Sequence, residues 1–213
     1  KNNYLDYVIK EDGLFSGKGV YIPNNDEEFF YFKNEFNNKR ELIVEKRLQG
    51  QEISLMAFCN GTDLYLMPQS LDYKKRNDNN LGPNTGGMGS VAPVNILNNE
   101  ELIIVKNHME KLVKKLNYVG VLYAGLMKTN EEIYFLEFNC RFGDPEAQVL
   151  LSLLNSDLYK IMIDCVNGKV PIINWSNNYS VCLVLSHKDY PYSRSNEELL
   201  IELDNEIKEY NIY

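Results

Sequence analysis

The sequence has few residues of the kinds that build disulfide scaffolds or zinc sites. Its 213 residues include four cysteines, two histidines and one tryptophan. The cysteines are Cys59, Cys140, Cys165 and Cys182. They are far apart and form no Cys-x-x-Cys pair, so neither a disulfide framework nor a zinc site is expected. We expect reduced thiols, as in a cytoplasmic protein.

Long apolar runs and an excess of positive charge are also missing. The longest apolar runs, such as residues 147–154, have the length of a strand or a helix, which is too short to span a bilayer. The net charge of −8 provides no general cationic field for nucleic acid or an anionic membrane. Neither is therefore expected as a partner, and an anionic ligand must be met by local basic residues.

The chain does contain the material for a folded core. Hydrophobic residues make up 44% of the sequence, which excludes a disordered protein. Apolar patterns predict strands at residues 7–10, 20–22, 41–48, 52–59, 64–67, 119–127, 133–138 and 181–186. Helices are predicted at residues 26–36, 98–116 and 156–166, with a further helix starting at Asp144-Pro145. Residues 71–93 show no period and are predicted to form a long functional loop. Interleaved strands and helices favour an α+β or α/β architecture in two lobes.

The first segment that could carry chemistry is a glycine-rich turn between two strands. It contains Lys10, Gly13, Gly17, Lys18 and Gly19. Glycines let backbone N–H groups converge on an anion, and the two lysines add positive charge. A P-loop is not supported, because Gly19 follows Lys18 where Ser or Thr should bind magnesium. A plain flexible hairpin is the alternative.

The second segment, residues 43–52, has the pattern of a hinge between two lobes. An apolar strand runs into charged residues and a turn at Gly50. Backbone groups of such a hinge could contact the edge of an adenine, while the carboxylate of Glu52 could hold ribose hydroxyls. A solvated strand end is the alternative.

The third segment, Leu-Gly-Pro-Asn-Thr-Gly-Gly-Met-Gly at residues 81–89, is rich in glycine and small polar residues. The residues before it include Asp72, Lys74, Lys75 and Arg76. The exposed backbone would form a concave surface, and the basic residues would supply cations for an anionic substrate. A mobile surface loop with solvated charges is the alternative.

The fourth segment, residues 135–146, combines a strand with acidic, amide and basic side chains. Strand alternation predicts Phe135, Glu137 and Asn139 on one face. A carboxylate and a carboxamide two residues apart could share Mg²⁺, which keeps other positions for phosphate and water. Arg141 follows and could neutralise charge on a transferred phosphoryl group. The alternative is a structural role, with Glu137 in a salt bridge and Arg141 paired with Asp144.

These four segments, in this order, resemble the ATP-grasp family and, within it, the phosphoribosylamine–glycine ligases of purine biosynthesis. The stretches VIKEDGLFSGKGV, GPNTGGMG, GVLYAGLM and FLEFNCRFGDPEAQ carry the resemblance, which covers about residues 7–186. It implies an α+β ATP-grasp fold with two lobes, a mixed or antiparallel sheet in each, and a nucleotide cleft between them. Residues 1–48 would be the small lobe, residues 49–180 the large lobe and residues 181–213 the beginning of a C-terminal domain. The family's N-terminal domain and most of its C-terminal domain would be missing.

The resemblance also implies a role for individual residues. ATP would be bound by Lys10, Gly13, Gly17, Lys18, Gly19, Glu45, Lys46, Leu48 and Glu52. Glu137 and Asn139 would bind Mg²⁺ or Mn²⁺. The catalytic residues would be Lys74, Arg141 and Asp144. The substrates would contact Asp72, Lys75, Asn84, Thr85, Gly86 and Gly87. Lys75 departs from the arginine that is common in the family, which changes the geometry available for a phosphate.

The implied reaction couples ATP cleavage to amide formation. Glycine's carboxylate would attack the γ-phosphate to give glycyl phosphate and ADP, and the amine of phosphoribosylamine would then displace phosphate. The partners would be these small molecules, and fusion to other purine-pathway enzymes stays open. Two alternatives remain at this point: another ATP-grasp carboxylate–amine ligase, and a non-catalytic nucleotide-binding remnant.

Overall fold

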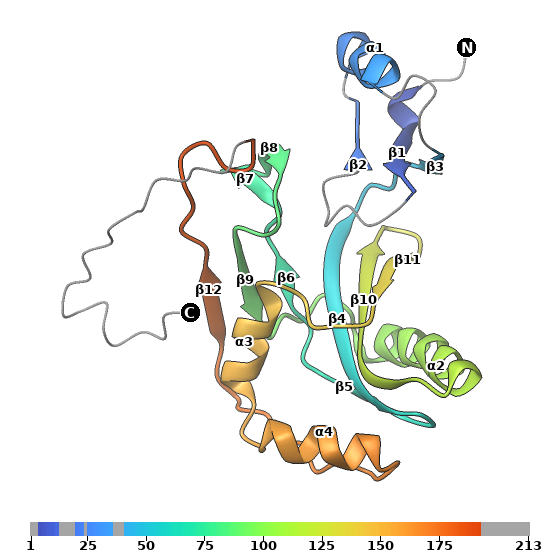
Figure 1. Ribbon diagram of the computed structural model, residues 1–213, viewed down its shortest axis with the longest axis vertical. Coiled ribbons are helices and arrows are strands. Elements are labelled where there is room, and N and C mark those ends of the chain that lie inside the picture. The colour runs from blue at the N-terminus through green and yellow to red at the C-terminus, as the bar shows by residue number, and fades with distance from the viewer. Residues whose placement is uncertain (1–3, 13–19, 24, 36–40, 193–213) are drawn as a thin grey trace, which may run out of the picture.

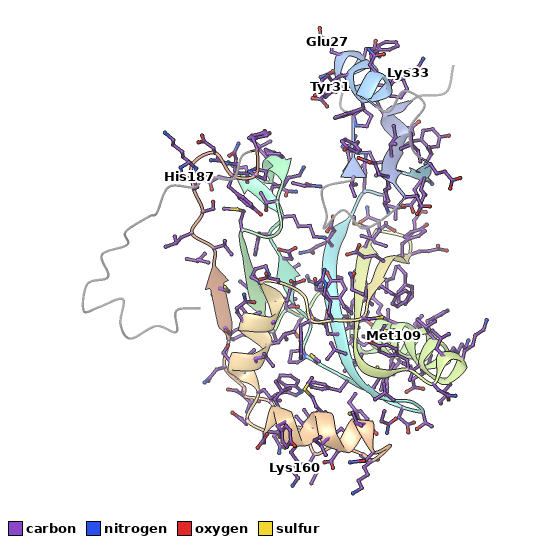
Figure 2. The ribbon with its side chains drawn as sticks, in the orientation of Figure 1. Glu27, Tyr31, Lys33, Met109, Lys160 and His187 are labelled. Atoms are coloured by element: carbon purple, nitrogen blue, oxygen red, sulfur yellow. The ribbon has the colours of Figure 1, made fainter. Side chains whose placement is uncertain are left out.

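The computed structural model describes residues 4–12, 20–23, 25–35 and 41–192. Strands β1 (Tyr7–Glu11), β2 (Val20–Tyr21) and β3 (Leu42–Lys46) follow a short 3-10 turn (Tyr4–Asp6) and form an antiparallel sheet in the order β2-β1-β3. Helix α1 (Asp26–Glu35) lies beside it, at one end of the molecule (Figure 1). Glu27, Tyr31 and Lys33 of α1 and Lys160 of the last helix lie at opposite ends (Figure 2).

A second sheet forms the centre of the molecule. It contains β4 (Gln51–Asn60), β5 (Leu64–Leu66), β10 (Val119–Lys128) and β11 (Ile133–Asn139). The strand order is β11-β10-β4-β5, and the pairs are antiparallel. Every residue of β4 from Ile53 to Asn60 is buried, because helices or strands cover both faces of this strand. Successive residues of a strand point to opposite faces, so β4 contributes to two separate apolar clusters.

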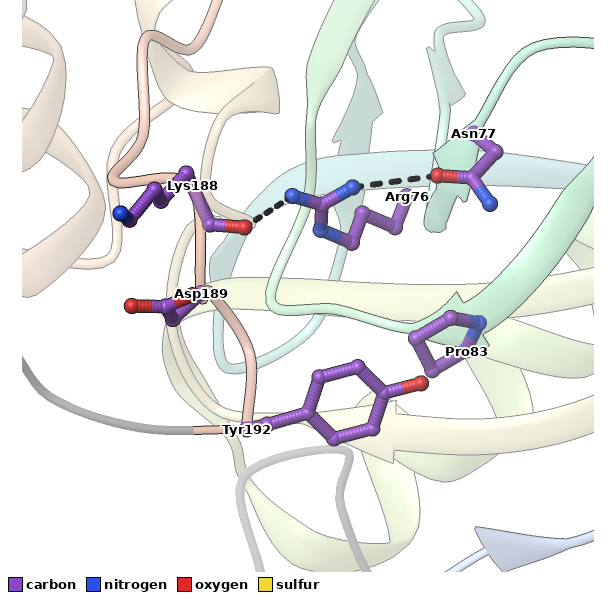
Figure 3. A pocket seen from close by; sticks show the side chains of 6 residues that line it. All are labelled: Arg76, Asn77, Pro83, Lys188, Asp189 and Tyr192. Carbon is purple, nitrogen blue, oxygen red and sulfur yellow. Dashed lines mark hydrogen bonds between the residues drawn. The ribbon is translucent and has the colours of Figure 1, made fainter.

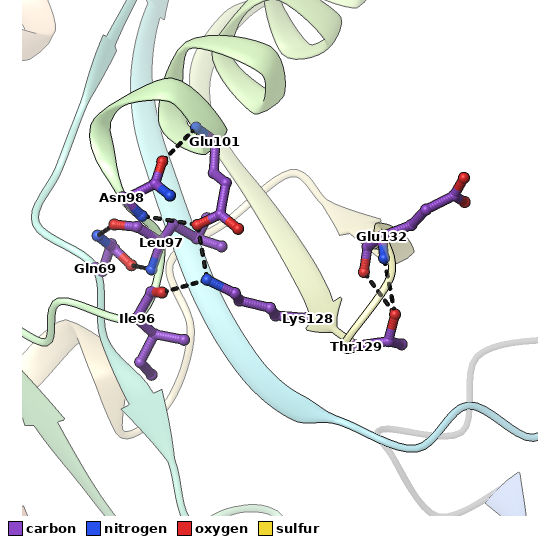
Figure 4. A network of polar contacts seen from close by, with 8 residues as sticks. All are labelled: Gln69, Ile96, Leu97, Asn98, Glu101, Lys128, Thr129 and Glu132. Carbon is purple, nitrogen blue, oxygen red and sulfur yellow. Dashed lines mark hydrogen bonds and ion pairs between the residues drawn. The ribbon is translucent and has the colours of Figure 1, made fainter.

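Helix α2 (Asn99–Leu116) covers one face of the central sheet. Its apolar stripe supplies Val105, Met109 and Val113 to the cluster, as the sequence predicts. Asn98 and Glu101 have the spacing of a capping box in the sequence. The structure confirms it: the Asn98 side chain accepts from the Glu101 N–H at 2.9 Å, and Glu101 accepts from the Asn98 N–H at 2.8 Å. Lys128 Nζ donates to Glu101 at 2.7 Å, which ties the start of α2 to β10 (Figure 4).

Helices α3 (Glu146–Leu153) and α4 (Leu158–Val166) pack on the other face of the central sheet. The second cluster contains Met56, Phe58, Met67, Ala92, Val121, Tyr123, Val149, Leu150, Leu153, Ile161 and Cys165. Asp157 caps α4 by accepting from the Lys160 N–H. All four cysteines are free thiols, as predicted. In the part of the chain described, no helix is long and apolar enough to cross a membrane.

The prediction of one long loop at residues 71–93 is wrong. This region forms β6 (Leu71–Asp72), β7 (Lys75–Asn77), β8 (Leu81–Asn84) and β9 (Gly89–Ala92). β7 and β8 make a hairpin whose turn residues Asn79 and Asn80 have φ of 57° and 59°, which is typical of a primed hairpin turn. β9 pairs with β6 and with β12 (Ser180–Leu183) in a third sheet. The strands are too short for periodicity to reveal them.

Two local predictions in the fourth segment are also wrong. Pro145, and not Asp144, is the N-cap of α3, and it makes no side-chain capping bond; Asp144 instead accepts from Gln148 Nε2 at 2.9 Å. In β11, the register shifts at a bulge, so that Leu126 faces Phe135 while Gly125 faces Glu137. The extra residue moves Phe135 to the face opposite Glu137. The antiparallel sheets and helices together give the predicted α+β architecture.

Candidate functional site

In the N-terminal sheet, two residues predicted to bind ATP form an ion pair. Lys10 on β1 lies diagonally across from Glu45 on β3, with Nζ 2.5 Å from Oε2. The predicted lid residues Gly13, Gly17, Lys18 and Gly19 lie outside the described residues.

The predicted hinge follows β3 directly. Lys46 is the last residue of β3 and faces Tyr7 across the sheet. The backbone N–H of Arg47 donates to the Asp6 carbonyl at 2.6 Å, which continues the pairing by one bond. Leu48 is half-buried, and the chain then enters β4 through Gly50, which packs against the Lys128 carbonyl so closely that a Cβ would lie 2.2 Å from this oxygen. The close approach explains the glycine at the point where the chain passes from one sheet to the other.

Glu52, which is predicted to bind ATP, and Lys74, which is predicted to be catalytic, form an ion pair. Lys74 Nζ donates to Glu52 Oε2 at 3.0 Å. Burial alone would lower the pKa of Lys74, but the adjacent Glu52 carboxylate raises this pKa above its ordinary value. Lys74 therefore stays protonated at neutral pH and supplies a fixed positive charge.

The glycine-rich third segment turns back over the residues that follow β6. The N–H and Oγ1 of Thr85 both donate to the Lys74 carbonyl at 2.8 Å, and Thr85 is buried. The Gly87 N–H in turn donates to Thr85 Oγ1 at 3.0 Å. The Gly86 N–H donates to the Tyr190 hydroxyl at 2.8 Å. Backbone groups and the hydroxyls of Thr85 and Tyr190 therefore hold this turn beside Lys74.

Gly87 is the point at which the third and fourth segments meet. Its φ is +121°, a region that residues with a Cβ rarely adopt. A Cβ at this position would lie 2.5 Å from Pro145 Cδ, 3.0 Å from Asp72 Oδ1 and 3.1 Å from the Asp144 carbonyl oxygen. The fold thus brings together three separate stretches that the sequence predicts to contact substrate.

Glu137 and Asn139 lie on one face of β11, as predicted for a metal pair. Asn139 Nδ2 donates to Glu137 Oε1 at 3.2 Å. Opposite Glu137 is Gly125, where a Cβ would lie 3.1 Å from Glu137 Cγ, so the small residue leaves room for the carboxylate. No group of three or more His, Cys, Asp or Glu side chains that could hold a metal occurs among the residues described. The oxygen donors of this pair fit a hard cation that takes its other ligands from phosphate and water.

Arg141 and the basic residues before the hairpin make other contacts. Arg141 is exposed and donates to the Phe142 carbonyl at 2.7 Å. Lys75 lies opposite Asn84 in the β7–β8 hairpin. Arg76 donates to the carbonyl oxygens of Lys188 and Tyr190.

A cavity of about 530 Å³ lies beside the β7–β8 hairpin (Figure 3). It is lined by Arg76, Asn77, Pro83, Lys188, Asp189 and Tyr192. Among the charged residues at positions 72–76, Arg76 lines this cavity, while the Lys74 side chain contacts Glu52 instead.

Sequence reasoning missed a buried polar network beneath the meeting point of these segments. Glu146 is only 2% exposed, and its Oε1 accepts from Ser54 Oγ at 2.7 Å. Ser54 Oγ is also 2.9 Å from the Tyr123 hydroxyl. Burial and the Glu146 carboxylate raise the pKa of Tyr123, so its hydroxyl keeps its proton. The available signal was a serine and a tyrosine within otherwise apolar strands.

Asp72 is the group whose charge this environment changes most clearly. Burial and then the Glu146 carboxylate raise the pKa of Asp72 to about 7, although Lys74 acts in the opposite direction. Its Oδ1 is buried and accepts no hydrogen bond. A carboxyl group that changes its protonation near neutral pH therefore lies against the glycine loop.

Comparison with known proteins identifies the family of this chain. Residues 1–147 match the family described as phosphoribosylglycinamide synthetase, ATP-grasp (A) domain. The chain is 40% identical over 204 residues to the trifunctional purine biosynthetic protein adenosine-3 of Drosophila melanogaster, covering 88% of this chain and 15% of that protein. It is 38% identical over 198 residues to a phosphoribosylamine–glycine ligase of Streptococcus pneumoniae, covering 86% of this chain and 47% of the relative.

A solved structure extends the match to three dimensions. The phosphoribosylamine–glycine ligase of Thermotoga maritima superposes with a TM-score of 0.75 at 33% identity, covering 90% of this chain and 52% of that one. The chain thus spans about half the length of the single-function ligases that it matches. The match confirms the predicted ATP-grasp fold, and this chain belongs to the phosphoribosylglycinamide synthetase ATP-grasp domain family.

Proposed function

We propose that the protein containing this chain joins glycine to 5-phosphoribosylamine with cleavage of ATP to ADP and phosphate. The observation that carries the proposal is the packing of Gly87 against Asp72 and Asp144, with Lys74 beside them. This arrangement supports a site for a small zwitterionic substrate, because anionic and cationic groups lie beside a turn that has no side chain to block access. The names of the relatives support glycine and phosphoribosylamine as substrates.

The nucleotide would lie between the N-terminal sheet and the central sheet. Lys10 and the lid glycines would contact the phosphates. The carbonyl of Lys46 and the N–H of Leu48 would contact adenine, and Glu52 would hold the ribose. In this proposal residues 1–48 form the small lobe, residues 49–180 the large lobe and residues 181–213 the beginning of a C-terminal domain.

The residues around the glycine loop would neutralise charge in the first step. A carboxylate and a triphosphate are both anions, so their reaction needs positive charge placed before they meet. Lys74, held by Glu52, and the exposed Arg141 would supply it. Glu137 and Asn139 would hold Mg²⁺ or Mn²⁺, which contributes further charge neutralisation when bound. Closure of the lid would keep water from the acyl phosphate.

The test is phosphate release by the full-length polypeptide with ATP, glycine and phosphoribosylamine, and with each omitted in turn. We expect full release only when all three are present. Glu137→Gln should lower the rate by about 100-fold or more if it removes a metal ligand. Glu131→Gln, in the exposed turn between β10 and β11, is the matched control and should have no effect. Release that does not depend on glycine would reject the substrate assignment.

A further inference from the structure

One carboxylate oxygen of Asp72 is more buried than a position at the end of a short strand requires. Asp72 ends β6, and its Oδ1 is buried without a hydrogen-bond donor. The residue as a whole is only partly buried. Gly87 lies against the side of Asp72 that carries the buried oxygen. Burying a carboxylate oxygen without a donor is costly, and an unsatisfied polar group is typically explained by a proton, a ligand or a catalytic role.

Four charged groups from separate parts of the fold act on Asp72, while its strand partner on β9, Ser90, is uncharged. They are Glu146 of α3, Asp144 before α3, Lys74 after β6 and Glu52 of β4. Lys74 is engaged with Glu52 at 3.0 Å, and Glu146 is engaged with Ser54 at 2.7 Å. Of these carboxylates, Asp72 has the unsatisfied oxygen beside the glycine loop, so it is the one poised to take up a proton.

We infer that Asp72 accepts the proton that the attacking amine loses when the carbon–nitrogen bond forms. This inference rests on the proposed function and adds a proton acceptor to it. The amine nitrogen forms a bond to the carbonyl carbon of glycyl phosphate, and the bond from this carbon to the phosphate oxygen breaks. The phosphate leaves with the bonding electron pair. One amine proton moves to Asp72 and from there to the departing phosphate, so that the amide and hydrogen phosphate are the products.

The environment of Asp72 suits this role. A base acts best when its pKa is close to the working pH, and the pKa of Asp72 is raised to about 7. Lys74 lies beside it as a permanent cation, which would hold the leaving phosphate while the proton moves. The neighbouring Glu146 accepts a hydrogen bond from Ser54, and its negative charge contributes to the raised pKa of Asp72.

Hydroxylamine separates the two steps of the reaction in the full-length polypeptide. With ATP and glycine it traps glycyl phosphate as a hydroxamate, and it is a strong nucleophile that is mostly unprotonated at neutral pH. We expect Asp72→Asn to lower kcat/KM for phosphoribosylamine by about 100-fold or more. Hydroxamate formation should stay close to that of the unaltered protein. Asp78→Asn, in the exposed hairpin turn, is the matched control and should change neither rate.

The unaltered protein provides a test that does not depend on the folding of a variant. Amide formation from phosphoribosylamine should decline as pH falls through about 7, while hydroxamate formation should not show this decline. Equal loss of both reactions in Asp72→Asn, no loss of either, or identical pH profiles in the unaltered protein would overturn the role of Asp72. Absence of any glycine-dependent hydroxamate in the unaltered protein would instead overturn the proposed function, and with it this inference.

Discussion

The N-terminal sheet and the central sheet differ sharply in how much they bury. Every residue of β3 is exposed, and Pro23 is the one buried residue among those before residue 49 whose exposure the structure describes. In β4, by contrast, eight consecutive residues from Ile53 to Asn60 are buried. The apolar side chains of Leu42, Ile43 and Val44 in β3 are exposed, whereas the apolar side chains of β4 are buried.

This difference indicates where the stability of the molecule comes from. Burial of apolar surface contributes about 25 cal/mol per Å² to stability. The central sheet has helices on both faces and therefore provides most of this stabilisation. The described residues of the N-terminal sheet bury little apolar surface, so we expect this sheet to gain stability when it binds a ligand. A lobe that closes over a nucleotide is expected to have this property, because regions of low local stability are the ones that move.

The largest expected effect comes from the same substitution made in both sheets. Leu126→Ala, in the fully buried part of β10, should lower the free energy of unfolding by about 2–5 kcal/mol, through lost burial and a cavity. Leu42→Ala, at a β3 position that is 38% exposed, should lower it by less than about 1 kcal/mol. Urea denaturation of both variants measures the difference. Equal losses would mean that the two sheets do not differ as described.

The sequence predicted the long elements of the central region because their patterns are strong. The stripe of Val105, Met109 and Val113 and the Asn98–Glu101 capping box specify α2 and its start without any tertiary information. The placement of Glu137 and Asn139 on one face was also predictable, since they are two residues apart in a strand.

Other features depend on contacts between distant residues. The β7–β8 hairpin rests on two asparagines with positive φ and on strands too short to show a period. The bulge in β11 lies where this strand pairs with Gly125 and Leu126 of β10, and it places Phe135 on the face opposite to the predicted one. The Ser54–Glu146 hydrogen bond joins residues 92 positions apart, so no local pattern could reveal it.

A second prediction compares buried and exposed acidic groups in the two regions. The pKa of Asp72 is raised from about 4 to about 7, so the folded chain holds this proton more tightly than the unfolded chain does. The free energy of unfolding should therefore fall as pH rises from about 4 to about 7. In Asp72→Asn this fall should be smaller by about 1–3 kcal/mol. Thermal or urea unfolding at several pH values measures it.

Glu45→Gln in the exposed Lys10 pair is the control for this experiment. It should change stability by less than about 1 kcal/mol, because the pair is only partly shielded from solvent and ion pairs near the surface contribute little. A pH dependence that is the same with and without Asp72 would show that this carboxyl does not titrate near neutral pH.

A third and smaller effect concerns asparagine caps in the two regions. Asn98 caps α2 in the central region, and Asn25 accepts from the Glu28 N–H at 2.8 Å at the start of α1. Asn98→Ala should cost about 1 kcal/mol of global stability. Asn25→Ala should cost less, because α1 belongs to the weakly buried region and can open before the centre unfolds. A larger loss for Asn25→Ala would reverse the comparison.

Hydrogen exchange with and without Mg-ATP tests the central claim most directly, namely that a nucleotide held near Glu137 and Asn139 stabilises the N-terminal sheet. We expect Mg-ATP to slow exchange in β1 and β3 by about 10-fold or more, while β4 and β10 change little because they are already buried. Glu137→Gln should abolish most of this protection. Protection that is absent from β1 and β3, or that is unaffected by Glu137→Gln, would contradict the account.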